Sequence, residues 1–276
     1  MEKLSELTKE FERKSEERFK SFEIESVVND LSKIQDDAYL ETSKWLGGDE
    51  KFVCLGIDLD KSSALSARKS AVTMAKLYEY FTQNIVDIMN IEDICADYID
   101  IKGDGVFGIY QGDDSIERAF VAAVTFRTFF EKVIKPKFGE LSVDLKCKSA
   151  ICKDKILVKK IGTRKYKNEV WAGKLVNNTY KIMAISKKIK ETFKKREKDS
   201  LLIVSSEIKT YLNDNYKKYA ILSCGCGSSD SRPVNLWYPF DVSDDEDVAG
   251  EKVFYLPSIW CDIHGDEYLA GILGLI

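Results

Sequence analysis

Residues 52–63 read FVCLGIDLDKSS, an apolar run that meets a carboxylate at Asp58 and then breaks into small polar residues. This pattern predicts a strand, a short turn and the start of a helix. Residues 98–110 read YIDIKGDGVFGIY, two apolar half-strands joined by a tight turn that contains Gly103 and Asp104. If the strands of these two stretches pair, Asp58 and Asp104 can face each other.

Two aspartates in these positions predict a cation site. Carboxylates at bonding distance repel each other unless a cation lies between them. Mg²⁺ takes oxygen ligands and is often held by one or two carboxylates together with substrate phosphates. The pattern therefore suggests a metal site for a phosphorylated substrate. A purely structural reading stays open, because a strand that ends in Asp is common and Gly-Asp-Gly is an ordinary turn.

The composition is that of a globular protein. Of the 276 residues, 44% are hydrophobic and 32% charged, and the formal net charge is −4. These values support one sizeable core with appendages and do not indicate general nucleic-acid affinity. No apolar run approaches the roughly 18 residues of a membrane span, and the charged N-terminus lacks the apolar core of a signal peptide.

The numbers of cysteines and histidines limit which redox states and catalytic mechanisms the sequence favours. The chain has seven Cys, an odd number, and most of them lie in strand-like runs. This fits reduced thiols in the cytoplasm better than a disulfide framework. His264 is the one histidine of the chain, so a mechanism that needs a histidine base in the central region is disfavoured.

The apolar pattern predicts a defined order of elements. Residues 1–47 predict one or two helices that pack on the core or on a second subunit, or that are simply solvated. The next predicted elements are strand 52–58, helix 63–90, strands 94–101 and 105–110, helix 115–134 ended by Pro136, and strand 142–152. A short strand pair at 155–162, a helix entered through 171–176, a basic helix at 186–198, strand 201–205 and helix 206–214 follow.

This order, β-α-β-β-α-β with later additions, predicts the split βαβ, ferredoxin-like arrangement. It belongs to the α+β class, with helices on one face of an antiparallel sheet. We expect an N-terminal helical segment at 1–50, a central domain at 51–222 and a C-terminal extension at 223–276.

With these elements in place, residues 50–222 resemble class III nucleotidyl cyclases. The first motif of that family is an apolar strand, a metal-binding Asp and a small loop before a helix, here IDLDKSSAL at 57–65. The second is a Gly-Asp hairpin, here Gly103 and Asp104. The third is a Gly, then Val-Asn, then a basic residue four positions after the Asn, here GKLVN at 173–177 and Lys181.

The resemblance implies a nucleotide site with two divalent cations, Mg²⁺ or Mn²⁺. Asp58 and Asp104 would be the paired ligands, and the Leu59 carbonyl would complete the site. Backbone N–H groups at the start of the following helix would cradle the phosphates. These groups belong to Lys61, Ser62 and Ser63. The ribose 3′ hydroxyl would attack the α-phosphorus and expel pyrophosphate, as in other two-metal in-line displacements.

The resemblance also implies a homodimer with active sites at the subunit interface. Asp58 and Asp104 would come from one subunit, and Asn177 and Lys181 from the other. Asn177 would hold the ribose, and Lys181 would stabilise charge on the phosphate oxygens. Most of the family has Arg where this chain has Lys181, and Lys cannot form the bidentate fork of Arg. Lys174 or Arg164 could serve instead.

The base-reading positions depart from those of purine cyclases. Four residues before the metal Asp, the family uses Lys for adenine and Glu for guanine, and this chain has Asp100. A second base-reading position falls near Val170, beside Glu169. These changes argue against a standard adenylyl cyclase. Asp100 could accept a hydrogen bond from uracil N3–H or from the exocyclic amine of cytosine, which leaves both pyrimidines open.

The whole chain resembles the pyrimidine cyclases of bacterial Pycsar anti-phage systems. The shared features are the helical N-terminus, a Cys-x-Cys at 224–226 and the Trp-Cys-x-x-His tail at 260–264. This resemblance implies synthesis of cyclic UMP, or as a second choice cyclic CMP, from UTP or CTP. The product would activate a separately encoded effector, often membrane-spanning or carrying a TIR domain, and the enzyme itself would be cytoplasmic. What activates the enzyme is not readable from the residues.

The C-terminal extension contains a possible zinc site. Its candidate ligands are Cys224, Cys226, Cys261 and His264. His264 lies three residues after a Cys, which is a usual ligand spacing, while Cys-x-Cys is tighter than the more frequent Cys-x-x-Cys. Such a site would be structural and would attach the tail to the core. The alternative is a set of buried free thiols and a histidine with ordinary hydrogen bonds.

Two other functions remain open from the sequence. A degenerate cyclase-fold module could bind nucleotide or a partner without turnover; the retained Asp58 and Asp104 oppose this reading and Lys181 favours it. A diguanylate-cyclase-like domain has the same element order, but the hairpin KGDG at 102–105 lacks the Gly-Gly-Asp/Glu-Glu-Phe motif of that family.

Overall fold

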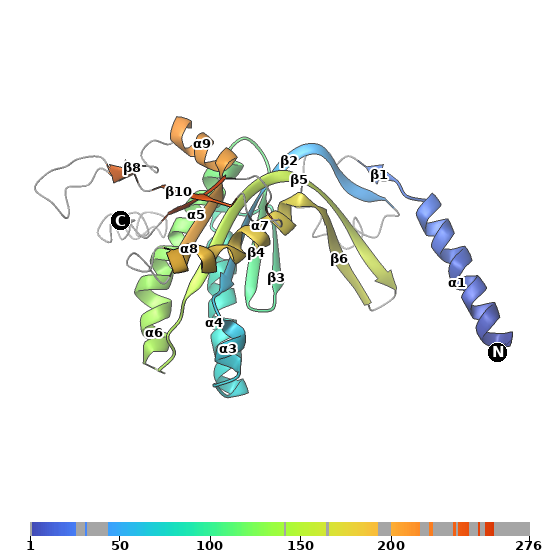
Figure 1. Cartoon of the computed structure of the whole chain (residues 1–276), viewed down its shortest axis with the longest axis horizontal. Helices are drawn as coiled ribbons and strands as arrows, with labels where there is room; N and C mark the ends of the chain where they lie inside the picture. Colours follow the sequence, from blue (N-terminus) through green and yellow to red (C-terminus); the bar gives the residue numbers. More distant parts are fainter. Residues whose placement is uncertain are drawn as a thin grey trace, which may run out of the picture. The chain divides into compact units, whose positions relative to one another are not determined.

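The structure is a computed structural model. It describes residues 2–25, 31, 44–140, 142–163, 166–192, 200–215, 221–222, 234–235, 237–242, 248 and 252–256. The predicted zinc ligands Cys224, Cys226, Cys261 and His264 lie outside these residues, as does Arg164, so their roles stay predictions. Contacts divide the chain into an arm unit, residues 1–50 with 155–173, and a core unit, residues 51–154 with 174–276 (Figure 1).

The core unit is built on a mixed sheet. Across this sheet the strands follow the order β10 (Tyr238–Asp241), β11 (Lys252–Leu256), β7 (Ser200–Ser205), β5 (Cys147–Thr163), β2 (Trp45–Leu59), β4 (Gly105–Tyr110) and β3 (Tyr98–Lys102). The strands β5 and β7 pair in parallel, whereas β2–β4, β3–β4, β7–β11 and β10–β11 are antiparallel. The α+β prediction is confirmed, but the expectation of a purely antiparallel sheet was wrong.

The hairpin of β3 and β4 forms as the turn signal predicts. Asp100 pairs with Phe107 and Lys102 with Gly105, so the chain reverses at Gly103 and Asp104. The strand β4 then pairs with β2 on its other side, where Gly56 lies opposite Phe107 and Ile57 opposite Val106. Every residue of β4 is buried, as expected for a strand with a neighbour on each side.

The long helix predicted at 63–90 is two helices. The helix α3 covers Ser62–Ser66, and α4 covers Ala71–Met89. The break arises because Ser70 caps α4: its side-chain oxygen accepts a hydrogen bond from the Thr73 N–H at 3.2 Å. The strand predicted from residue 94 begins later, because Glu92–Ile94 form a 3₁₀ turn before β3.

The helix predicted at 115–134 also differs. The helix α5 covers Ser115–Phe129, continues through a π-helical turn at Phe130–Ile134, and leads into α6 at Lys135–Gly139. Pro136 therefore does not end the helix. It occupies the first turn of α6, where a missing N–H removes no hydrogen bond.

The main core lies between one face of the sheet and the helices α4 and α5. The Phe81 ring of α4 meets the Phe126 ring of α5 edge-on, with centroids 5.5 Å apart and planes at 89°. Fully buried side chains of β2 lie against these helices, among them Val53, Leu55 and Ile57. Burial of one such side chain stabilises the fold by about 1.5–3 kcal/mol.

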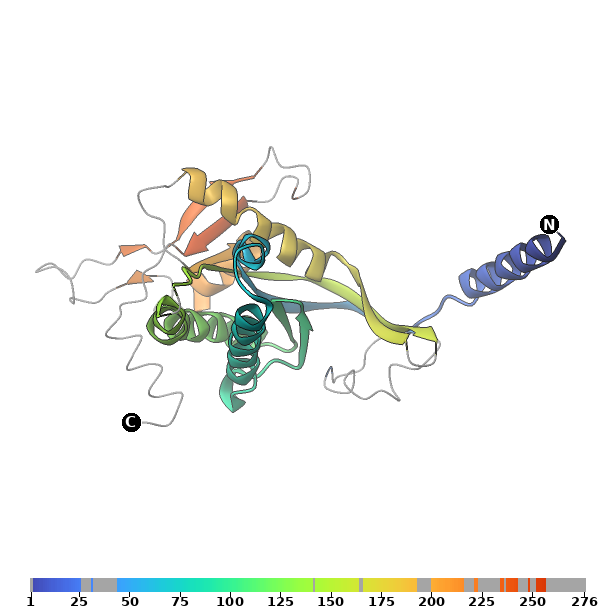
Figure 2. The same ribbon diagram turned by 90° about the horizontal axis from the view of Figure 1, so that it is seen from below.

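A further helix pair covers the opposite face of the sheet, which sequence reasoning did not expect. Figure 2 shows α4 and α5 on one side of the sheet and α7 (Lys174–Ala184) with α8 (Ser186–Thr192) on the other. The helix α7 packs directly on β2 at Gly56. A Cβ at this glycine would lie 2.9 Å from a methyl carbon of Thr179 and 2.9 Å from that of Met183.

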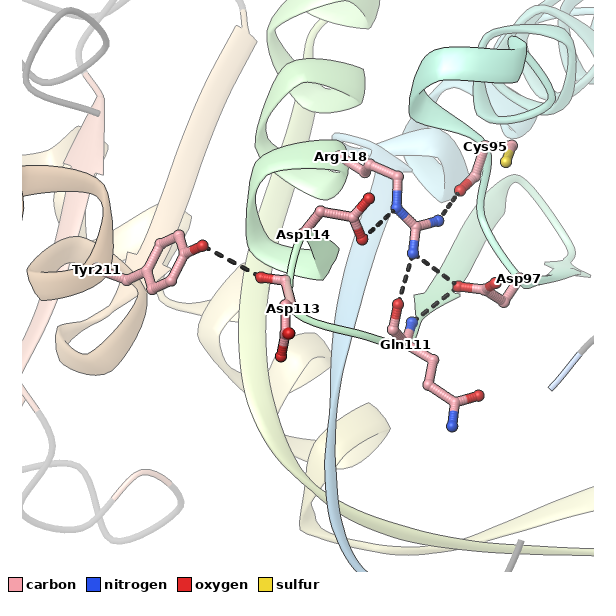
Figure 3. A network of polar contacts seen from close by, with 7 residues as sticks. All are labelled: Cys95, Asp97, Gln111, Asp113, Asp114, Arg118 and Tyr211. Carbon is pink, nitrogen blue, oxygen red and sulfur yellow. Dashed lines mark hydrogen bonds and ion pairs between the residues drawn. The ribbon is translucent and has the colours of Figure 1, made fainter. Parts of the chain in front are cut away.

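An arginine fixes the base of the β3–β4 hairpin (Figure 3). The Arg118 guanidinium on α5 donates to the Cys95 carbonyl at 2.5 Å and to the Gln111 carbonyl at 2.6 Å. It also forms ion pairs with Asp97 at 3.2 Å and with Asp114 at 2.9 Å. Asp97 in turn accepts from the Gln111 N–H at 2.8 Å. Arg118 thus connects the start of β3, the end of β4 and helix α5.

The later elements complete the core unit. The strand predicted at 201–205 is β7, and the helix predicted at 206–214 is α9 (Ser206–Asn215). The Tyr211 hydroxyl of α9 donates to the Asp113 carbonyl at 3.2 Å (Figure 3). The short strands β8 (Ile221–Leu222) and β9 (Val234–Asn235) pair separately. The basic helix predicted at 186–198 is described as α8 up to Thr192.

The arm unit consists of a helix and strand pairs. It contains α1 (Glu2–Lys20), and β1 (Ile24–Glu25) pairs with the beginning of β2. The second half of β5 pairs with β6 (Tyr166–Gly173), so the two strands expected at 142–152 and 155–162 are one strand with a separate partner. On α1, the apolar side chains Leu7, Phe11 and Phe19 are exposed.

No helix within the described ranges is both long and apolar enough to cross a membrane.

Candidate active site

The site begins where β2 meets the β3–β4 hairpin. Asp58 follows Ile57, which pairs with Val106, so the register continues to place Asp58 opposite Gly105. A Cβ on Gly105 would lie 3.0 Å from Asp58 Oδ1, closer than nearly all real contacts of that kind. The glycine of the hairpin therefore leaves the space that the Asp58 carboxylate occupies.

Asp58 and Asp104 lie within electrostatic reach of each other. Partial burial raises the pKa of the Asp58 carboxyl above its ordinary value, and the negative charge of Asp104 raises it further. One oxygen of Asp104, Oδ2, is buried and has no hydrogen-bond partner among the described residues. A buried carboxylate oxygen without a partner is costly, and a bound cation would remove that cost.

The nearest cation to Asp58 is one that sequence reasoning missed. Lys148 Nζ on β5 lies 3.0 Å from Asp58 Oδ2, and the two side chains are 21% and 22% exposed. Its hydrogen bond and charge lower the pKa of Asp58, although burial outweighs them. The available signal was a lysine inside an otherwise apolar strand pattern, between the buried residues Cys147 and Ser149.

A tyrosine on α7 was missed as well. Tyr180 packs its ring edge-on against Phe107 of β4, with centroids 6.3 Å apart and planes at 84°. Its hydroxyl is buried and has no hydrogen-bond partner among the described residues. Burial raises the pKa of Tyr180, and the nearby Cys54 thiol and the carboxylates of Asp58, Asp100 and Asp104 raise it further.

Asp100, the predicted base-reading residue, has a cation of its own. The Lys102 ammonium lies 2.7 Å from Asp100 Oδ2, although the angles at this contact are not those of a hydrogen bond. Asp100 and Phe107 are paired residues of β3 and β4, and Gly56 follows in the same row on β2. Because paired residues share a face, Asp100 lies on the face of the sheet that α7 covers.

The other predicted site residues lie on α7 and at the start of α3. Asn177, Lys181 and Lys174 are exposed on α7. Lys61 has a left-handed backbone, with φ of 59°, at the start of α3, and its carbonyl accepts from the N–H groups of Ala64 and Leu65. Ser62 is half-buried and Ser63 exposed.

Leu59 directs its side chain into the core, where it is 1% exposed. Its backbone carbonyl remains the predicted ligand atom. Val170 and Glu169 lie on β6 in the arm unit.

The two carboxylates fit a hard divalent cation that takes its remaining ligands from water and a bound substrate. Within the described part of the chain, no three His, Cys, Asp or Glu side chains gather as a complete metal-binding cage. Asp58 and Asp104 provide two carboxylates, and Mg²⁺ commonly uses one or two carboxylates and takes its other ligands from water and phosphate. The partnerless Asp104 oxygen and the space beside Gly105 agree with this use.

Solved structures with a similar fold are nucleotide cyclases and their relatives. The guanylyl cyclase Cya2 matches with a TM-score of 0.54 at 16% identity, covering 76% of this chain and 92% of that chain. A class III adenylyl cyclase-like ATP-binding protein from Pseudomonas aeruginosa matches with a TM-score of 0.55 at 13% identity, covering 72% and 42%. At these identities the likeness concerns the fold, which is that of class III cyclase catalytic domains.

Closer relatives are found at the level of sequence. No protein-family model matches the chain. A uridylate cyclase of Micromonospora echinofusca is 30% identical over 227 residues, covering 80% of this chain and 68% of the relative. A uridylate cyclase of Propioniciclava tarda is 29% identical over 227 residues, with the same coverage. By this similarity the chain belongs to the uridylate cyclases, and it is a pyrimidine nucleotide cyclase with the class III fold.

Proposed function

We propose that the protein converts UTP, or as a second choice CTP, into the 3′,5′-cyclic monophosphate and pyrophosphate. The observation that carries this proposal is the Asp58 carboxylate opposite Gly105, in the field of Asp104 and 3.0 Å from Lys148. The names of the two sequence relatives favour uracil. In the reaction, the ribose O3′ loses its proton to water and forms a bond to the α-phosphorus, while the bond from that phosphorus to the bridging oxygen of the β-phosphate breaks and pyrophosphate leaves.

Asp58 and Asp104, with the Leu59 carbonyl, would hold two Mg²⁺ or Mn²⁺ ions. Such ions, when bound, offset the charge of the triphosphate and make the ribose hydroxyl more acidic. The role of the two aspartates is to stay ionised and fixed. Lys148 supports this role because its charge favours the ionised form of Asp58.

The remaining residues would position the nucleotide. Backbone N–H groups at Lys61, Ser62 and Ser63 would contact the phosphates, and Asp100 would accept a hydrogen bond from the base. Asp100 also forms an ion pair with Lys102 of its own strand.

We further propose a homodimer in which α7 of one subunit completes the site of the other. Asn177 would hold the ribose and Lys181 would stabilise the phosphate charge, with Lys174 or Arg164 as substitutes. The exposure of Asn177 and Lys181 supports this arrangement, because side chains that face solvent in one chain can be contacted by a partner subunit. The cyclic nucleotide would then act on a separate effector protein in defence against phage.

The test is a product assay with matched variants. The pure protein is incubated with Mn²⁺ and each of the four nucleoside triphosphates, and the products are separated by chromatography. We expect cyclic UMP from wild type and none from Asp58→Ala or Asp104→Ala. Asp87→Ala, which removes an exposed carboxylate on α4, should leave the activity unchanged.

The alternative is nucleotide binding without turnover. The Lys at position 181 favours it, since a single ammonium cannot form the fork of an arginine at the phosphate. An intact dimer that binds nucleotide but yields no product with any of the four triphosphates would establish this alternative.

A further inference from the structure

One helix lies over the carboxylate site in the same chain, and one of its side chains has no role in the mechanism above. Helix α7 packs on β2 at Gly56, two residues before Asp58 on the same face of that strand. The helix presents Asn177 and Lys181 to solvent. Tyr180, between them in sequence, instead lies against Phe107 on the sheet of its own chain.

The Tyr180 hydroxyl is a buried polar group without a hydrogen-bond partner among the described residues. Native proteins rarely leave such a group without a hydrogen-bond partner. The polar groups whose fields reach it are the Cys54 thiol and the carboxylates of Asp58, Asp100 and Asp104. Asp104 has a partnerless buried oxygen of its own. Two buried polar atoms near Asp58, neither with a hydrogen-bond partner among the described residues, indicate that a ligand binds here and interacts with both.

A neutral donor is suited to this position. Lys148 already pairs with Asp58, and a further cationic side chain here would compete with a divalent cation for the carboxylates, whereas a phenol adds no charge. A phenol is protonated near pH 7, so the hydroxyl can act as a donor. The carboxylates themselves can only accept, so the acceptor-rich part of a nucleotide needs its donors from elsewhere.

We infer that Tyr180 is a substrate-binding residue whose hydroxyl donates a hydrogen bond to an acceptor oxygen of the nucleoside triphosphate bound at Asp58 and Asp104 of the same chain. This inference rests on the proposed function for the identity of the ligand. It gives α7 two tasks. Tyr180 contacts the nucleotide of its own chain, while Asn177 and Lys181 reach the site of the partner.

The chain offers a matched pair of variants. Tyr180→Phe removes the hydroxyl and keeps the ring that packs on Phe107. Tyr110→Phe removes another buried hydroxyl that has no hydrogen-bond partner within the described ranges, but Tyr110 faces the core formed with α4 and α5. Because neither hydroxyl bonds to a described residue, neither change should lower Tm.

The measurement is binding of 3′-deoxy-UTP with Mn²⁺ by calorimetry, because this nucleotide lacks the attacking hydroxyl and cannot cyclise. We expect Tyr180→Phe to weaken binding about tenfold, as for loss of a hydrogen bond to a charged group, and Tyr110→Phe to bind like wild type. With UTP, the kcat/KM of Tyr180→Phe should fall by a similar factor.

The other possible outcomes test the role of Tyr180 and the proposed function separately. Equal binding by Tyr180→Phe and wild type would overturn the inference, as would a Tm of Tyr180→Phe well below wild type, which would reveal a structural bond. Wild type that binds 3′-deoxy-UTP but forms no cyclic product from UTP would refute the proposed function alone, and weaker binding by Tyr180→Phe would still support this role for the tyrosine. Wild type that binds no nucleotide would refute both.

Discussion

Lys148 and Asp58 form an ion pair across adjacent strands of the sheet, with Nζ 3.0 Å from Oδ2. Both side chains are largely buried, at 21% and 22% exposure. The lysine therefore compensates the charge that Asp58 would otherwise carry alone in a poorly hydrated place. In the proposed enzyme the Asp58 carboxylate would also ligate a cation, so Lys148 and the cation would share this carboxylate.

The first prediction concerns Lys148→Met. Burial raises the pKa of Asp58, and Lys148 opposes that rise, so removal of the lysine should raise the pKa further. Because a divalent cation binds the ionised carboxylate, the pH midpoint of Mn²⁺ binding should move upward, while affinity at high pH should be maintained. Titration calorimetry between about pH 5 and pH 8 measures this shift. Lys137→Met, which breaks an exposed pair with Glu140, is the control. An unchanged midpoint would contradict the prediction.

The second prediction concerns stability against pH. A carboxyl whose folded-state pKa lies above its unfolded value binds protons more readily when folded. Its contribution to stability is present below the unfolded pKa of 3.8 and is lost as the pH rises through the folded-state pKa. The double variant Asp58→Asn with Lys148→Met removes both charges. The metal-free double variant should therefore lose less of its free energy of unfolding over that pH range than wild type. Urea unfolding at a series of pH values tests this, and a steeper loss would contradict it.

The third prediction uses two glycines of one hairpin. In Gly105→Ala the new Cβ would lie 3.0 Å from Asp58 Oδ1, so the carboxylate has to shift by a few tenths of an ångström. We expect Mn²⁺ affinity and kcat/KM to fall about tenfold, because small displacements of reacting groups are costly. Gly103→Ala is the counterpart. Its φ of 67° disfavours a side chain by about 1 kcal/mol, but nothing lies within 4 Å of the added Cβ.

Gly103→Ala should therefore lower stability and leave Mn²⁺ binding unchanged, the reverse of Gly105→Ala. Thermal unfolding and metal titration of both variants separate the two effects. If both variants lost stability and neither lost metal binding, Gly105 would be an ordinary turn residue and the space beside Asp58 would have no role.

The fourth prediction concerns Arg118, which joins three segments at the base of the hairpin (Figure 3). Arg118→Met would leave the Cys95 and Gln111 carbonyls without their donor and Asp97 without its cation. We expect a loss of about 2–3 kcal/mol in the free energy of unfolding, since the guanidinium side chain is only 13% exposed. The control is Arg68, which is exposed and lies just after the C-terminal end of α3. Arg68→Met should change the free energy of unfolding by less than about 0.5 kcal/mol.

How much of the fold could be predicted from the sequence depends on whether local residues determine each element. The β3–β4 hairpin and the pairing with β2 could be predicted, because turn residues and apolar runs act locally. The helix break at Ser70 and the continuation of the helix past Pro136 were not predicted. The apolar pattern runs through both positions, and only the structure shows the helix cap at Ser70 and the π-helical turn before Pro136.

The same distinction between local and long-range signals applies to the residues of the candidate site. The proximity of Asp58 and Asp104 could be predicted because each ends or interrupts a strand in a recognisable pattern. The positions of Lys148 and Tyr180 near them could not, because these depend on which strand adjoins β2 and on which face of the sheet α7 covers. A lysine in a strand and a tyrosine in a helix carry no local sign of these long-range contacts.

The last prediction tests whether two chains share each site. Asp58→Ala and Asn177→Ala should each be inactive alone. In a mixture of equal amounts that has exchanged subunits, half of the dimers contain one chain of each kind, and each of these has one site with both defects and one with none. Activity should recover to about a quarter of wild type. Mixing Asp58→Ala with Asp104→Ala is the control: both defects fall in the same half of a site, so neither site of the mixed dimer is intact and no activity should return. A site complete within one chain would give no recovery in either mixture, and the exposed Asn177 would then have to act in its own chain.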